Sequence, residues 1–152
     1  MRSIRSMMCA MAIVMLAGCA SGPGFKEASA GFPQVTLTPQ AGDGGVDVVA
    51  LKDAAGELIQ CKSSSRAGAE LGWEAIKDVV TGEAAFRIRH PGVRFSKVCV
   101  TNQYFNGGAR EQATHNHVRL VNRDEVLKLA EQYPLRLIEV EQVLYPDWGA
   151  KG

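Results

Sequence analysis

Three polar residues lie close together in the sequence, in a pattern that suits phosphodiester hydrolysis. Asp47 stands near the start of a short β-branched run, and Gln60 and Lys62 lie two residues apart in the next run. Because side chains alternate between the two faces of a strand, Gln60 and Lys62 are expected on one face and Cys61 on the other. Carboxylate and amide oxygens bind Mg²⁺, the metal polarises a phosphate and activates a water, and an ammonium orients that water or screens the growing charge.

The same spacing also has a simpler interpretation. An aspartate at a turn followed by Gln-x-Lys on a strand is a common arrangement, and a solvated hairpin with an exposed lysine would show it equally well. From the pattern alone we favour the solvated hairpin.

The elements that would position these residues follow from the hydrophobic pattern. Apolar and β-branched runs predict strands at residues 35–38, 46–51, 57–62, 98–101 and 118–121, and helical spacing predicts helices at 71–80, 108–115 and 124–132. The second and third strands are expected to form a hairpin. The sequence therefore predicts an α/β domain in which Asp47, Gln60 and Lys62 can meet at one edge of a sheet.

Composition limits the chain to one small globular domain. The chain has 152 residues, of which 46% are hydrophobic and 22% charged, and this excludes collagen-like and disordered chains. The formal charge is +1, so a nucleic acid would have to be held by a local patch. Cys61 and Cys99 lie in apolar runs without a CxxC pair, which favours buried thiols over a disulfide framework or a structural zinc site.

The N-terminal segment has the three parts of a bacterial export signal. Arg2 and Arg5 precede an apolar run at residues 7–17, and the segment ends in Leu-Ala-Gly-Cys at Cys19. This ending resembles the lipobox of bacterial lipoproteins, which would make Cys19 the lipidated residue and residues 20–31 a tether. An ordinary hydrophobic helix is the alternative, because motifs this short also arise by chance.

Several further segments occur in a fixed order along the chain. They are Gly31-Phe32, residues 42–50 around Asp47, Gln60-Cys61-Lys62, residues 100–105, residues 109–113 and a late stretch at residues 120–127. Together they resemble the catalytic domain of the Mrr-like restriction endonucleases, which belong to the PD-(D/E)xK nuclease superfamily. The resemblance implies a restriction-endonuclease-like fold, with a central mixed β-sheet flanked by helices, and a Mg²⁺-dependent DNA endonuclease.

The resemblance also implies a role for each residue of the motif. Asp47 takes the place of the family's metal-binding aspartate, Lys62 that of its catalytic lysine, and Gln60 that of the superfamily's glutamate. The Mg²⁺ ligands would be Asp47, Gln60 and the backbone carbonyl of Cys61, and an uncharged amide among them would weaken metal binding. The candidate contacts to the DNA backbone, each with a solvated loop as the alternative, are Ser63, Arg66 and Asn102.

The N-terminal part departs from the family's pattern and leaves two functions open. The family begins with an amphipathic helix whose glutamate supports the metal site, and here the signal-like segment and tether take that place, unless residues 7–17 form the helix. The first function is a Mg²⁺-dependent DNA endonuclease of the Mrr-like restriction type, either active or degenerate. An active nuclease would be cytoplasmic. The second is a membrane-anchored lipoprotein whose nuclease-like domain has lost catalysis and acts as a binding module.

The chain is therefore expected to divide into four parts. These are a signal-like or helical segment at 1–19, a tether at 20–31, the nuclease domain at 32–132 and a C-terminal extension at 133–152 with no assigned task. DNA is the expected partner. A homodimer and a membrane contact through lipidated Cys19 are left open.

Overall fold

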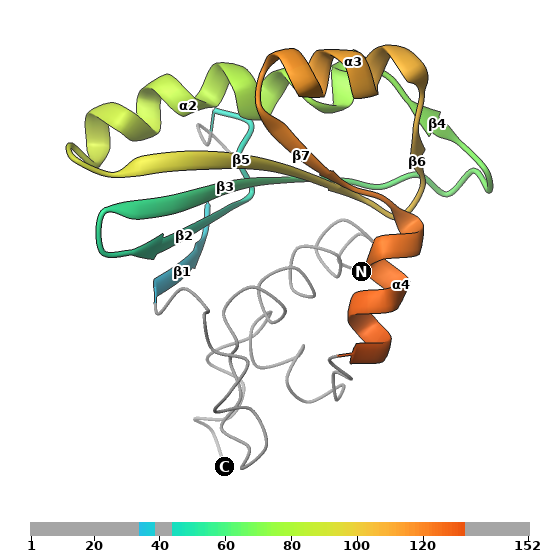
Figure 1. Cartoon of the computed structure of the whole chain (residues 1–152), viewed down its shortest axis with the longest axis horizontal. Coiled ribbons are helices and arrows are strands. Elements are labelled where there is room, and N and C mark those ends of the chain that lie inside the picture. The colour runs from blue at the N-terminus through green and yellow to red at the C-terminus, as the bar shows by residue number, and fades with distance from the viewer. Residues whose placement is uncertain (1–33, 39–43, 133–152) are drawn as a thin grey trace.

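A mixed five-stranded sheet forms the centre of the computed structural model, which describes residues 34–38 and 44–132 (Figure 1). The strands lie in the order β1 (Gln34–Leu37), β2 (Val48–Lys52), β3 (Ala55–Lys62), β5 (Arg94–Thr101) and β7 (Val118–Val121). β1, β2 and β3 are antiparallel neighbours, whereas β3, β5 and β7 run parallel to one another. The predicted α/β fold with a mixed sheet and a hairpin at β2 and β3 is confirmed.

Helices lie on both faces of this sheet. α2 (Lys77–Arg89) and α3 (Gly107–His115) cover one face, and α4 (Arg123–Gln132) follows β7 on the other (Figure 1). A short 3-10 helix, η1 (Trp73–Ala75), precedes α2. A second, two-stranded parallel sheet pairs β4 (Glu70–Leu71) with β6 (Tyr104–Phe105).

Side-chain caps begin α3 and α4. The Oδ1 atom of Asn106 accepts a hydrogen bond from Ala109 N at 2.8 Å, at the first turn of α3. Asn122 Oδ1 accepts from Asp124 N at 2.9 Å, and Glu125 Oε2 accepts from Asn122 N at 3.2 Å, which forms a capping box for α4. Both helices begin within one residue of their predicted starts.

Alternation along the strands divides the core between the two faces. Leu58 belongs with Phe86 of α2 to one buried cluster, whereas its neighbour Ile59 belongs to a second cluster on the opposite face. Cys61 lies in the second cluster, against which Val126 of α4 packs. A fully buried Leu or Ile side chain stabilises a fold by about 1.5–3 kcal/mol. Each face of the sheet therefore holds α-helices by apolar burial.

Two predictions about side-chain environment are confirmed by this division. Gln60 and Lys62 share the face of Leu58, toward α2, while Cys61 points to the other face. Cys61 and Cys99 are both free and buried.

The helix predicted at residues 71–80 is wrong in its bounds. Leu71 lies in β4, where it pairs with Phe105, and Gly72 is extended, so α2 begins only at Lys77 and continues to Arg89. The pairing partner lies more than thirty residues further along the chain. Local spacing cannot reveal such a contact, because periodicity carries information only about neighbours.

A glycine-mediated contact joins the turn before β2 to α2. Gly44 and Gly45 have φ angles of 63° and 81°, a region that glycine adopts without strain. A Cβ atom at Gly82 of α2 would collide with the Gly44 carbonyl oxygen, and one at Gly45 would collide with Asp78. The turn therefore lies directly against the helix backbone.

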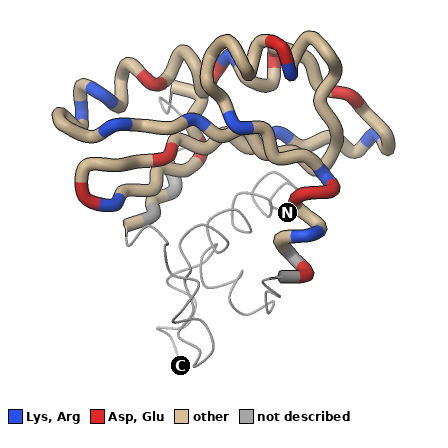
Figure 2. The backbone as a smooth tube through the Cα atoms, in the orientation of Figure 1, with Lys and Arg blue, Asp and Glu red and all other residues tan. Residues whose placement is uncertain are grey.

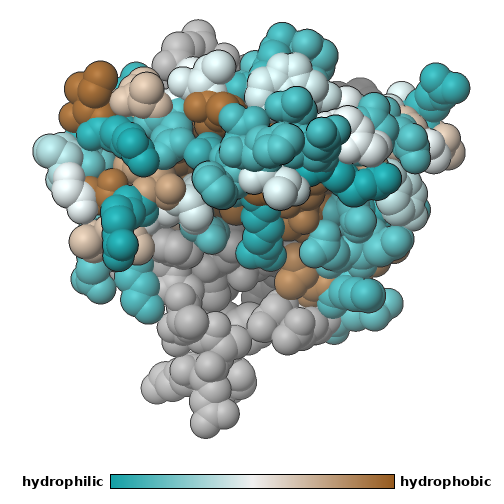
Figure 3. Space-filling view, turned by 45° about the horizontal axis from the view of Figure 1, so that its top comes forward, coloured by the Kyte–Doolittle hydropathy of each residue, from teal (hydrophilic) through white to brown (hydrophobic). Residues whose placement is uncertain are grey.

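Charged side chains are spread over the described surface. Figure 2 shows Lys and Arg interleaved with Asp and Glu along the strands and helices. The view that brings the α2 and α3 side forward is mainly hydrophilic, with a few apolar patches (Figure 3). No face of single sign stands out in the part of the chain described, so a nucleic acid would be bound through a local group of cations.

Several predictions lie outside the described residues. They concern the signal-like segment with Cys19, the packing of residues 7–17, the tether and the C-terminal extension. Across residues 34–38 and 44–132, none of the helices has the length and apolar character needed to span a membrane.

Candidate active site

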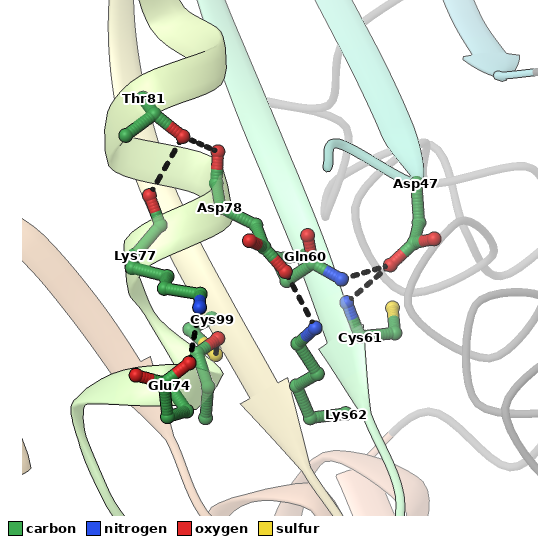
Figure 4. A network of polar contacts seen from close by, with 10 residues as sticks. Asp47, Gln60, Cys61, Lys62, Glu74, Lys77, Asp78, Thr81 and Cys99 are labelled. Carbon is green, nitrogen blue, oxygen red and sulfur yellow. Dashed lines mark hydrogen bonds and ion pairs between the residues drawn. The ribbon is translucent and has the colours of Figure 1, made fainter. Parts of the chain in front are cut away.

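Asp47 and Gln60 meet directly at the open end of the hairpin, where the start of β2 lies beside the end of β3. Asp47 immediately precedes β2, and its backbone N donates to Ile59 O at 2.8 Å, which fixes its position beside β3. Its Oδ2 atom accepts hydrogen bonds from Gln60 Nε2 at 2.8 Å and from Cys61 N at 2.7 Å (Figure 4). Two donors on one oxygen hold the carboxylate in a single orientation.

Gln60 is fully buried and keeps one polar atom unpaired. Its exposed fraction is 0%, so the solvated-hairpin alternative is wrong for this residue. A carboxylate can only accept, so the contact with Asp47 requires that Nε2 face it and leaves Oε1 as the second polar atom. Oε1 is buried and has no hydrogen-bond donor among the described residues. An unsatisfied buried acceptor costs about 1–3 kcal/mol, which a cation would remove.

Lys62 ends β3 and forms an ion pair that the sequence did not predict. Its Nζ atom lies 2.8 Å from Oδ2 of Asp78, in the first turn of α2 (Figure 4). The two side chains are 26% and 34% exposed. An acidic residue early in the helix that follows the lysine strand is the signal that could have indicated Asp78.

The buried thiol of Cys99 lies near the charged groups of Asp47, Lys62 and Asp78. Burial is the main cause that raises the pKa of Cys99 to about 12; Lys62 lowers this pKa, and the carboxylates of Asp47 and Asp78 raise it. Its Sγ atom donates to Ala75 O at 3.2 Å. Because thiolates and not thiols are nucleophiles, Cys99 is chemically inert at neutral pH.

The predicted DNA-contact residues occupy different environments. Ser63 and Arg66 are exposed on the loop that follows Lys62. Asn102, in contrast, is used within the protein: its Oδ1 atom accepts from Ser64 N and its Nδ2 atom donates to Ser64 O, both at 3.0 Å. Asn102 therefore anchors the loop that carries Ser63 and Arg66, and DNA contact by all three residues stays a prediction.

Over the described residues, no three His, Cys, Asp or Glu side chains come close enough together to hold a metal ion. A ligand set in this part of the chain would include the amide oxygen of Gln60 or backbone carbonyls beside Asp47.

Comparison with known proteins identifies the family of this chain. Residues 24–130 match the family model Mrr_cat, described as a restriction endonuclease. The chain belongs to this restriction endonuclease family. Membership places the domain among the DNA nucleases, in agreement with the resemblance seen in the sequence.

Two solved structures have a fold similar to that of this restriction endonuclease domain. AF1548, a protein of unknown function, is 15% identical with a TM-score of 0.56, over 93% of this chain and 77% of that chain. The MspJI restriction endonuclease in complex with a 27-mer oligonucleotide is 18% identical with a TM-score of 0.55, over 95% of this chain. This chain covers only 31% of the MspJI chain. No curated protein sequence matches the domain.

Proposed function

We propose that this restriction endonuclease domain is a Mg²⁺-dependent DNA endonuclease of the Mrr-like type, with Asp47, Gln60 and Lys62 as its active site. The observation that supports this best is the buried, unpartnered Oε1 atom of Gln60 beside the Asp47 carboxylate. An oxygen of this kind is costly in a folded protein unless a ligand uses it. Restriction endonucleases typically use divalent metal ions, and oxygen donors are the ligands that Mg²⁺ prefers.

The residues present fit such a metal. The proposed ligands are the carboxylate of Asp47, Oε1 of Gln60 and the backbone carbonyl of Cys61. All three lie where the start of β2 is beside the end of β3. Because Gln60 Nε2 and Cys61 N already hold Oδ2 of Asp47, the carboxylate needs little reorganisation to bind a cation. When bound, the metal would polarise the scissile phosphate and lower the pKa of a bound water.

Lys62 supplies the positive charge in this proposal. It follows Gln60 by two residues on the same face of β3, and its side chain is partly exposed. Its ammonium group would donate hydrogen bonds to the attacking water or to a phosphate oxygen, and would offset the negative charge that develops there. Ser63 and Arg66 follow directly on an exposed loop, so the DNA backbone would be bound next to the amine.

Metal-dependent cleavage of plasmid DNA tests the proposed function. We expect the purified chain to convert supercoiled plasmid to nicked circles with Mg²⁺. Excess EDTA should leave the plasmid intact, because it removes the metal that would polarise the phosphate. Gel electrophoresis of a time course measures the rate. Intact plasmid with Mg²⁺ or Mn²⁺, in a sample whose calorimetry shows metal binding, would leave a degenerate nuclease as the better description.

Replacing Gln60 with glutamate tests the metal site without DNA. We expect Gln60→Glu to destabilise the metal-free protein by about 1–4 kcal/mol, because a second carboxylate would face Asp47. Mg²⁺ is expected to recover that loss and to raise the melting temperature more than it does in the wild type, since the site would gain a charged ligand. Thermal unfolding at several Mg²⁺ concentrations measures both effects.

Gln103→Glu is the matched control. Gln103 is also a buried glutamine with an unpartnered Oε1 among the described residues, but its Nε2 atom donates to Ser64 O and not to Asp47. The destabilisation caused by Gln103→Glu should persist when Mg²⁺ is added. Equal recovery in both variants would contradict a metal site at Gln60.

A further inference from the structure

We propose that Asp78 of α2 is the positioning residue for Lys62: its carboxylate holds the ammonium group at the place where the phosphate would be bound. The inference rests on the proposed function, because it assigns a partner to the proposed catalytic lysine. It adds a residue from a helix to an active site otherwise built entirely from the β2 and β3 hairpin.

The short distance between Lys62 and Asp78 is the first observation that supports this role. Lys62 Nζ and Asp78 Oδ2 are 2.8 Å apart, within the range of a charge-assisted hydrogen bond. Figure 4 shows the carboxylates of Asp78 and Asp47 on opposite sides of Gln60, with the Lys62 amine beside them. A lysine side chain has four rotatable bonds, so a fixed partner is needed to hold its amine at one point.

The position of Asp78 is itself fixed by the backbone contact between the glycine turn and α2. A Cβ atom at Gly45 would collide with the Cα and Cβ atoms of Asp78, so the turn lies against this residue itself. Gly82, one helical turn further on, lies in the same way against Gly44. The turn that leads into Asp47 therefore also sets the place of Asp78, and the two carboxylates are positioned together.

The pair differs from the ion pairs that are local to this helix region, and one further pair, Lys97 of β5 with Glu83 of α2, also joins the helix to the sheet. Glu74 with Lys77 and Glu83 with Arg87 are local contacts three and four residues apart, typical of helix surfaces. The Lys62 pair instead joins β3 to α2 across sixteen residues and is less exposed than the Glu74 pair. A partly exposed pair contributes little to stability, so its value would lie in where it places the amine.

Separate measurement of kcat and KM for plasmid nicking tests this role. Asp78→Asn removes the charge that holds Lys62 and also a charge that repels DNA. We expect kcat for plasmid nicking to fall about 10- to 100-fold while KM stays unchanged or falls, because misplacement of a reacting group slows the chemical step. Asp78→Glu keeps a carboxylate and should recover most of the rate. Glu74→Gln, which removes an exposed charge nearby, should leave both constants unchanged.

A second measurement reads the amine directly and needs no cleavage. Lys62 should be acylated several-fold faster by an N-hydroxysuccinimide ester in Asp78→Asn than in the wild type, whereas Lys52 should not change; peptide mass spectrometry measures both rates. Melting temperatures of all variants report folding.

The two measurements separate the inference from the proposed function. If the wild type cleaves no DNA, the proposed function fails and acylation alone decides whether Asp78 holds Lys62. An unchanged acylation rate of Lys62 in Asp78→Asn overturns the inference. So does an active wild type whose kcat is unaffected by Asp78→Asn, or is lost equally in Asp78→Glu.

Discussion

Replacement of Lys62 by methionine is expected to slow DNA cleavage about 10²- to 10³-fold while the domain stays folded. Loss of one preorganised donor at a developing negative charge typically costs a factor of this size. Methionine retains the length and apolar stem of the side chain, and the Asp78 carboxylate left without Lys62 is 34% exposed and can be hydrated. Single-turnover nicking rates and thermal unfolding measure the two parts of the prediction.

Lys52→Met provides the matched control for this variant. Lys52 is an exposed lysine at the end of β2, so its replacement removes the same charge away from the proposed site. We expect its nicking rate to stay close to that of the wild type. Comparable rates for Lys62→Met and the wild type would remove Lys62 from the proposed mechanism.

Replacement of Asp47 by alanine is expected to abolish metal binding and to lower the free energy of unfolding by about 2–4 kcal/mol. The variant leaves Gln60 Nε2 and Cys61 N without their acceptor, and an unsatisfied buried donor costs about 1–3 kcal/mol. It also removes the one charged ligand from the proposed metal site. Titration calorimetry with Mg²⁺ and denaturant unfolding measure these losses separately.

Asp47→Asn separates the structural role of Asp47 from its role toward the metal. Its side-chain oxygen can still accept from Cys61 N, so much of the stability should return. Metal binding should remain weak, because an amide carries no charge. A wild-type Mg²⁺ affinity in Asp47→Asn would argue that the metal binds elsewhere.

The part of the site that sequence predicted best is the part built from local structure. Gln60 and Lys62 lie on one strand, where side-chain direction follows from counting, and Asp47 directly precedes the strand joined to it by a short turn. The fold followed for the same reason, because most strands and helices were marked by apolar runs and helical spacing. The family motifs extended this prediction to the roles of Asp47 and Lys62.

Features set by long-range contacts were not predicted. Asp78 reaches Lys62 from the first turn of α2, sixteen residues further along the chain. Asn102 was predicted only as a DNA contact, which stays a prediction, and the binding of its amide to the backbone of a residue 38 positions earlier was not predicted. Neither partner can be found by spacing along the chain, because each depends on how distant segments pack.

The backbone contact at Gly82 limits how this domain can diverge. Two main chains touch there with no side chain between them, so neither surface has a flexible group that could absorb a larger neighbour. A single added methyl group would have to displace the helix as a rigid body, and with it the carboxylate that reaches the amine. A side chain at position 82, which is uncharged and lies outside the proposed ligand set, would thus change the distances within the proposed active site.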